Sequence, residues 1–181
     1  MKAKTRVTIE DLYREHGKAE IVGGKLIHMA PTGGRPGYVA GEIFASLRQH
    51  ARRTRQGRAV TDNNAFRVRL SNRDSFSPDA AFYTGPDPGM RFYEGAPVFA
   101  AEVRSESDYG AAAEQAIVDK RHDYFAAGTL VVWDVDLLGE DVVRVYRATD
   151  PDHPTVYRRG QVAEAKPAVP DWTMPVDDLF A

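Results

Sequence analysis

Two acidic residues lie in strand-like, apolar segments of the chain, where a carboxylate is costly. Asp79 follows Pro78 in S-F-S-P-D-A-A-F-Y, and Glu102 lies inside P-V-F-A-A-E-V-R. The spacing of 23 residues accommodates one strand, a loop and the next strand. An acid in such a segment needs a nearby cation or a proton. Two carboxylates from neighbouring strands can bind one divalent metal ion, so the pair predicts metal-dependent cleavage of phosphodiester bonds.

The neighbours of Glu102 are suited to the same chemistry. Side chains two residues apart in a strand share a face, so Arg104 is expected to point the same way as Glu102. Arg104 would then bind a phosphate oxygen or hold Glu102 ionised. Mg²⁺ prefers oxygen ligands in octahedral geometry and keeps several waters. Asp79, Glu102 and a strand carbonyl such as that of Val103 would suffice as its protein ligands.

The helix expected after these strands offers a further cation. Ala113, Ile117, Lys120 and Tyr124 recur at helical spacing and share one face. A lysine in this otherwise core-facing stripe predicts a carboxylate partner. We expect Lys120 to orient the attacking water or to stabilise the charge that develops on the phosphate. Glu20, in the strand-like segment A-E-I-V, is a third candidate acid for the same site.

Each of these residues also has a plain structural alternative. Asp79 is suited to capping the turn after the proline, and Glu102 to pairing with Arg104 at a sheet edge. Glu20 is suited to an exposed position on a hairpin. The most basic stretch suits either phosphate contacts or a solvated helix end whose cations favour the helix dipole. That stretch contains Arg52, Arg53, Arg55 and Arg58.

The segments around these residues indicate an α/β fold with a mixed sheet flanked by helices. Helical spacing predicts helices over residues 38–54 and 111–127, and Thr8 and Asp11 predict a short capped helix over 8–16. Gly23-Gly24 predicts a hairpin over 19–29, and residues 30–37 are expected to be a loop. Apolar or alternating segments predict strands at 66–70, 78–84, 97–104, 129–135, 142–147 and 155–158. The tail is expected to pack through Trp172, Met174, Val176, Leu179 and Phe180.

Composition sets limits on the class of protein. With 181 residues, of which 43% are hydrophobic and 28% charged, one globular domain over residues 1–181 is expected. The absence of cysteine excludes disulfides, thiolate zinc sites and cysteine nucleophiles. A net charge of −2 argues against a protein that coats nucleic acid, although it permits a local basic groove. The sequence shows no signal peptide and no membrane span, so a soluble cytoplasmic protein is expected.

Longer stretches of the chain carry a family resemblance. In order, they are Y-R-E-H-G-K-A-E-I-V-G-G-K-L-I-H-M-A-P-T-G-G, S-P-D-A-A-F, A-E-V-R-S-E-S-D, D-K-R-H-D-Y-F-A-A-G-T-L-V-V-W-D-V-D and P-D-W-T-M-P-V-D-D-L-F. With these segments the chain resembles the Uma-type restriction endonuclease family, part of the PD-(D/E)xK nuclease superfamily. The resemblance covers nearly the whole chain.

The resemblance implies a restriction-endonuclease-like core, a divalent cofactor (Mg²⁺ or Mn²⁺) and a homodimer. It assigns the acidic pair of the motif to Asp79 and Glu102, the upstream acid to Glu20 and the helix lysine to Lys120. The position of the motif's own lysine is held by Arg104. We therefore predict a metal-dependent endonuclease that acts on a nucleic acid, namely DNA.

One departure from the family pattern supports a second hypothesis. Where a histidine is expected before the first long helix, the chain reads G-G-R-P-G-Y, with Arg35 and Pro36. This difference, Arg104 and the acidic pI of about 6.2 favour a nuclease-like fold that has lost turnover and binds nucleic acid or a protein partner. A third hypothesis is a metal-dependent hydrolase of small phosphate esters. Fold likeness alone does not establish activity.

Overall fold

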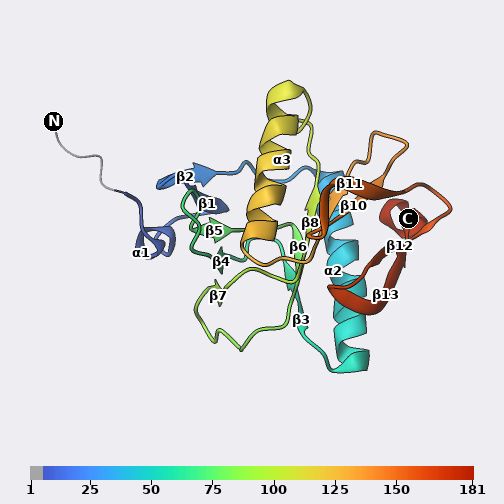
Figure 1. Cartoon of the computed structure of the whole chain (residues 1–181), viewed down its shortest axis with the longest axis horizontal. Helices are drawn as coiled ribbons and strands as arrows, with labels where there is room; N and C mark the ends of the chain where they lie inside the picture. Colours follow the sequence, from blue (N-terminus) through green and yellow to red (C-terminus); the bar gives the residue numbers. More distant parts are fainter. Residues whose placement is uncertain (1–5) are drawn as a thin grey trace.

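A six-stranded mixed sheet lies at the centre of the computed structural model, which describes residues 6–181 (Figure 1). Its strand order is β11-β10-β9-β8-β6-β3, and β8 and β9 are its parallel pair. The strands are β3 (Arg58–Thr61), β6 (Ala80–Tyr83), β8 (Phe99–Val103), β9 (Val131–Val135), β10 (Val143–Arg147) and β11 (Asp150–Tyr157). Parallel neighbours need a crossover connection, and a helix supplies it between β8 and β9.

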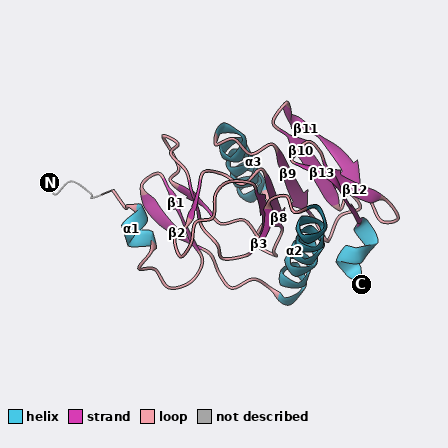
Figure 2. Cartoon of the chain, turned by 90° about the horizontal axis from the view of Figure 1, so that it is seen from below, coloured by secondary structure: helices cyan, strands magenta, loops and turns pink. Residues whose placement is uncertain are grey.

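Two long helices cover opposite faces of this sheet (Figure 2). α2 (Gly34–Thr54) packs an apolar stripe against the face that carries Phe99 and Trp133. α3 (Ala111–Ala126), the crossover helix, packs Tyr124 against the other face. No helix in the described part of the chain is both long enough and apolar enough to cross a membrane.

A small N-terminal unit packs beside the sheet. It comprises α1 (Ile9–Leu12), the hairpin strands β1 (Ala19–Val22) and β2 (Lys25–His28), and the short strands β4 (Phe66–Arg67), β5 (Ser75–Phe76) and β7 (Tyr93–Glu94). Gly23 and Gly24 form the hairpin turn at φ values of 58° and 71°, which glycine adopts without strain. The N–H of Ile21 donates to Ser75 Oγ at 2.8 Å, so β1 is tied to the segment that leads into β6.

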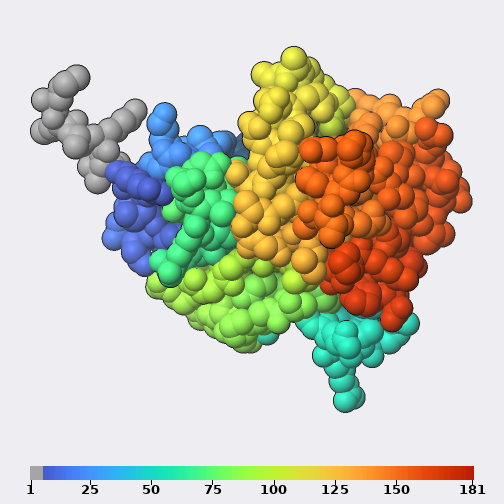
Figure 3. Space-filling view, viewed as in Figure 1, coloured from blue at the N-terminus to red at the C-terminus, as the bar shows by residue number. Residues whose placement is uncertain are grey.

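The C-terminal segment forms a second hairpin rather than an irregular tail. It contains β12 (Val162–Ala165), β13 (Val169–Pro175) and a final 3₁₀ turn, η1 (Val176–Phe180). Trp172 packs against Trp133 with ring centroids 4.9 Å apart, and its indole N–H donates to Ser46 Oγ of α2 at 3.0 Å. Figure 3 shows α3, in yellow, between the N-terminal unit and these C-terminal strands.

Most of the predicted elements are confirmed. The hairpin turns at Gly23-Gly24, Thr8 and Asp11 form the predicted capping box, and α3 ends just before Gly128. The mixed sheet flanked by helices is also confirmed. Of the predicted tail anchors, the first four are buried and Phe180 is partly buried.

Four predictions of element bounds are wrong. α2 begins at Gly34, not at residue 38, because the first N–H groups of a helix have no partner inside it and Pro36 therefore costs nothing there. The helix predicted over 8–16 ends at Leu12. The strand predicted over 66–70 spans only two residues, and the strand predicted over 155–158 begins earlier, at Asp150. The sequence also gave no prediction of β3, β12 or β13, whose partners lie far away in the sequence or across an unrecognised turn.

The packing of the Trp172 indole predicts that its removal strongly destabilises the fold. Trp172→Ala removes a side chain that is 3% exposed and joins β13 to α2 and Trp133. We expect the free energy of unfolding to fall by about 3–5 kcal/mol, measured by urea denaturation. Val162→Ala, on the same hairpin but at a 52% exposed position, is the matched control. Equal effects of the two variants would contradict this role of Trp172.

Candidate active site

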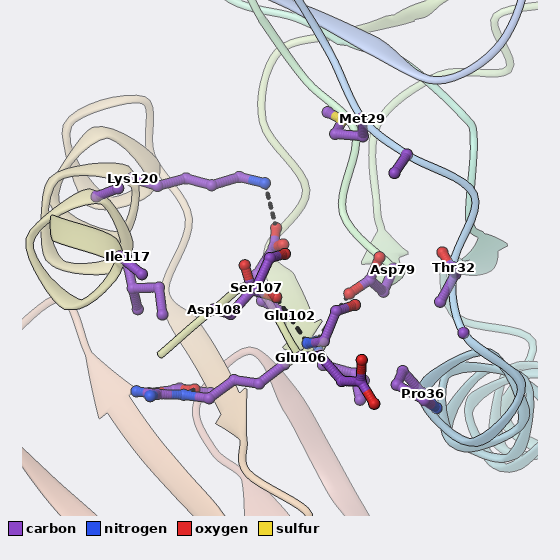
Figure 4. Close-up of a pocket in the computed structure, with 18 of the residues that line it drawn as sticks. Met29, Thr32, Pro36, Asp79, Glu102, Glu106, Ser107, Asp108, Ile117 and Lys120 are labelled. Carbon is purple, nitrogen blue, oxygen red and sulfur yellow. Dashed lines mark hydrogen bonds and ion pairs between the residues drawn. The ribbon is translucent and has the colours of Figure 1, made fainter. Parts of the chain in front are cut away.

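A cavity of about 910 Å³ opens at the edge of the sheet where β6 begins and β8 ends (Figure 4). Asp79 and Glu102 lie on its floor, and Lys120 reaches into it from α3. The opposite wall comes from the connection between β2 and α2, including Thr32, and from the first turn of α2, including Pro36. The cavity therefore lies between α3 and the start of α2, two segments that are far apart in the sequence.

Strand pairing brings the two acids of the sequence motif together. Ala80 of β6 lies opposite Ala101 of β8, so Asp79 and Glu102 form the next opposed pair and face the same side. The N–H of Asp79 donates to the carbonyl of Ala101 at 3.1 Å. Its carboxylate Oδ2 in turn accepts the N–H of Val103 at 2.8 Å. These bonds fix Asp79 against the end of β8.

Glu102 is held from the side of α3. Its Oε1 accepts a hydrogen bond from the Tyr124 hydroxyl at 2.6 Å and lies 2.9 Å from Lys120 Nζ. Burial raises the pKa of Glu102, and the negative charge of Asp79 raises it further, although Lys120 opposes both. The ionised form of Glu102 is therefore incompletely compensated by the protein.

Glu20 and Lys120 form the back of the site. Lys120 Nζ lies 3.0 Å from Glu20, whose carboxylate also accepts from Arg73 at 2.6 Å and from the N–H of Ser77 at 2.8 Å. Burial opposes ionisation of Glu20, but the charges of Lys120 and Arg73 outweigh it and hold the pKa of Glu20 below its ordinary value. Burial likewise opposes the charge on Lys120, but Glu102 and Glu20 raise its pKa. Glu20 is only 4% exposed, so the alternative of an exposed position on the hairpin is wrong.

Eight charged groups form a series of contacts at one side of the cavity, and four of them, Lys18, Asp79, Glu102 and Lys120, line it. In spatial order they are Asp62, Lys18, Asp79, Glu102, Lys120, Glu20, Arg73 and Asp123. Each neighbouring pair in this series, with one exception, joins a cation to a carboxylate, and the nitrogen and oxygen atoms lie within 3.0 Å of each other. Asp79 and Glu102 are adjacent acids with no cation between them. Five carboxylates and three cations leave a formal excess of two negative charges.

The gap in this series has the donor chemistry of a divalent metal site. Carboxylate and carbonyl oxygens are the ligands that Mg²⁺ and Mn²⁺ prefer, and Glu102 Oε2 accepts no hydrogen bond from residues 6–181. Within the same residues, no three acidic or histidine side chains converge to form a complete cage. Asp79, Glu102, a main-chain carbonyl and waters fit the requirements of such an ion.

The predicted ion pair between Arg104 and Glu102 is wrong. Arg104 makes two hydrogen bonds of 2.7 Å to Asp134, its neighbour on β9, and pairs with Glu114 at the start of α3. Asp134 is 3% exposed and requires a cation, whereas Glu102 already has Lys120. The predicted phosphate contact of Arg104 stays a prediction, and it would require release of the half-exposed Glu114.

The residues that sequence reasoning missed are Lys18, Arg73 and Asp62. Lys18 stands two residues before Glu20. Side chains at this spacing in a strand share a face, so the sequence could have placed Lys18 beside the site. Asp62 lies in a turn and Arg73 in an isolated β-bridge with Val22, and neither gave a periodic signal. Arg35 stands where a histidine was expected. It belongs to the first turn of α2, lines the cavity and packs its guanidinium 5.3 Å from the ring centre of Phe180.

Comparison with solved structures defines the class of fold. The chain is similar to a crystal structure from Anabaena variabilis ATCC 29413 described as "a putative nuclease belonging to DUF820". The TM-score is 0.74 at 18% sequence identity, over 96% of this chain and 97% of the other. At this identity the likeness concerns the fold, which is that of a mixed α/β nuclease-like protein.

The family follows from the sequence match. The model of the Uma2 family, described as "Putative restriction endonuclease", matches residues 7–177, and the chain belongs to this family. The family resemblance drawn from the motifs is therefore confirmed. Comparison with curated proteins gives no match.

The opposite pKa shifts of Glu20 and Glu102 predict opposite pH trends in stability. Glu20 has a lowered pKa in the folded state, so its contribution is present above its unfolded value near 4.5 and is lost as pH falls through the folded value. Glu102 has a raised pKa, so its contribution is present below about 4.5 and is lost as pH rises through the folded value.

Urea denaturation between about pH 3.5 and 8 tests this difference. Relative to wild type, Glu102→Gln is expected to gain stability as pH rises, whereas Glu20→Gln is expected to lose it. Asp119→Asn, at an exposed position on α3, provides a control with little pH trend. If the stabilities of Glu102→Gln and Glu20→Gln relative to wild type change with pH in the same direction, the predicted difference between the two acids is wrong.

Proposed function

We propose that this protein is a metal-dependent endonuclease that hydrolyses phosphodiester bonds in DNA. Membership of the Uma2 family supports the reaction class. The observation that carries the proposal is the adjacent pair Asp79 and Glu102, the one place where the charge series of the cavity lacks a cation. A site used only for folding would gain stability by placing a cation or a neutral residue there.

In this proposal Asp79, Glu102 and the carbonyl of Val103 hold Mg²⁺ or Mn²⁺. When bound, the ion supplies a Lewis acid for the scissile phosphate and lowers the pKa of a coordinated water. The protein supplies the remaining groups. Tyr124 and the N–H of Val103 fix the two carboxylates in orientation before substrate arrives.

Lys120 has an electrostatic role in the proposal, not that of a general base. Its pKa is raised by Glu102 and Glu20, so the ammonium keeps its proton at neutral pH. A permanent cation beside the scissile phosphate stabilises the negative charge of the transition state. Glu20 is a positioning residue, because it holds Lys120 from behind and is itself fixed by Arg73.

The size of the cavity is compatible with a phosphate and its flanking nucleotides. Its volume of about 910 Å³ lies within the range of typical ligand sites. Arg104 is proposed as a second phosphate contact, made when Glu114 is released. A homodimer is part of the proposal, because cutting both strands of a duplex in one encounter requires two such sites.

The rival function is a nuclease-like module that binds without turnover. Two observations favour it: Arg35 and Pro36 replace the expected histidine at the cavity wall, and Lys18 already pairs with Asp79. A divalent metal site distinguishes the two functions, because a module that only binds has no use for it.

Cleavage of supercoiled plasmid with Mg²⁺ or Mn²⁺ tests the proposal. Asp79→Asn and Lys120→Met are each expected to reduce the rate of nicking by at least about 100-fold, because each removes a group that acts on the transition state. Asp119→Asn, which removes a carboxylate next to Lys120 in sequence but exposed to solvent, is expected to cut like wild type.

Two results would contradict the proposal. Equal nicking by wild type and both site variants would place the activity outside this cavity. Absence of nicking together with absence of metal binding in calorimetry would favour the binding module. Cleavage of a small phosphodiester that DNA does not inhibit would instead favour a hydrolase of small phosphate esters.

A further inference from the structure

Lys18 occupies an unusual place in the charge series. Its ammonium lies 2.7 Å from Asp79 Oδ1 and 2.7 Å from Asp62 Oδ1, and its side chain is 14% exposed. Asp79 Oδ2 is meanwhile engaged by the N–H of Val103. Both carboxylate oxygens of Asp79 therefore already have partners from the protein, unlike Glu102, whose Oε2 has none within residues 6–181.

A divalent ion at Asp79 would approach the same carboxylate as the Lys18 ammonium. Two cations within a few ångströms of one another repel strongly in a partly buried site, because the effective dielectric constant there is lower than in water. Lys120 lies near such an ion too, but it contacts Glu102 at Oε1 and so leaves Oε2 free for the ion. Metal binding at Asp79 therefore disfavours the Lys18–Asp79 contact in particular.

Asp62 offers Lys18 an alternative position. Asp62 lies in the turn after β3, and its side chain is 37% exposed, against 12% for Asp79. A buried ammonium that loses its partner is costly, but Lys18 can leave Asp79 while it keeps Asp62. The exchange moves the charge toward the more exposed of the two acids.

We propose that Lys18 is an exchangeable counter-cation for the metal site. Without metal it neutralises Asp79; with metal it is displaced, remains with Asp62 and presents its ammonium to a phosphate of the nucleic acid. This inference rests on the proposed function, since it requires a metal at Asp79. Lys18 is a positioning residue in the metal-free state and a phosphate contact in the loaded state, so metal binding and nucleic-acid binding are coupled.

Calorimetric titration with MnCl₂, without nucleic acid, tests the exchange. Lys18→Met removes the competitor and is expected to tighten Mn²⁺ binding about five- to tenfold, the effect of roughly one ion pair. Asp62→Asn leaves Asp79 as the sole partner of Lys18 and is expected to weaken binding by a similar factor. Lys25→Met, at an exposed position on β2, is expected to leave the affinity unchanged.

The double variant Lys18→Met/Asp62→Asn shows whether Asp62 affects metal binding through Lys18 or only through its own charge. If Asp62 acts through Lys18, Asp62→Asn has little effect in the Lys18→Met background; if it acts only as a distant charge, its effect is undiminished. A second readout is the affinity for a cleavage-resistant DNA duplex. Mn²⁺ is expected to raise this affinity in wild type and to raise it less in Lys18→Met.

The outcomes distinguish failure of this inference from failure of the proposed function. If wild type binds Mn²⁺ and Asp79→Asn does not, but Lys18→Met binds no more tightly than wild type, the exchange is overturned and the metal site stands. Additive effects in the double variant also overturn the exchange. If neither wild type nor any variant binds Mn²⁺, both the metal site and the exchange fall.

Discussion

The interaction on which this structure depends is the compensation of carboxylates in a partly buried cavity. An ionised acid removed from water requires a cation, a hydrogen-bond donor or a proton. The chain meets this requirement for Glu20 through Lys120 and Arg73. It meets it for Asp79 through Lys18, but it leaves the neighbouring Glu102 incompletely compensated. Charge complementarity therefore holds the site together, and its single gap gives the site its capacity for a divalent ion.

The same ion pairs join elements that the hydrophobic core does not join directly. Glu20 of β1, Arg73 of a loop and Asp123 of α3 form one buried chain, so the N-terminal hairpin is fixed to the crossover helix. Arg104 and Asp134, which line the cavity, add an ion pair at the ends of β8 and β9, two strands that the sheet already joins. Because one partner of a buried pair cannot be lost without leaving the other unpaired, the geometry of the site and the packing of these elements are coupled.

Several features of the fold could be predicted locally because their causes are local. The Gly23-Gly24 turn, the cap at Thr8 and the apolar stripe of α2 follow from backbone freedom, short-range hydrogen bonds and helical period. The start of α2 at Gly34 and the strands β12 and β13 could not be predicted in this way, and β4 was predicted too long. Their hydrogen bonds are made with partners chosen by tertiary packing, which no local pattern encodes.

The sequence by itself determined that Asp79 and Glu102 lie at strand positions that require compensation, that Lys120 lies on the inner face of a helix, and which family the chain belongs to. Only the tertiary structure decided the partners: Arg104 binds Asp134, whereas Lys18 binds Asp79. Period and spacing fix the face on which a side chain lies. The pairing of charges depends on distances of a few ångströms between separate elements, and these are set when the sheet, the hairpin and α3 pack together.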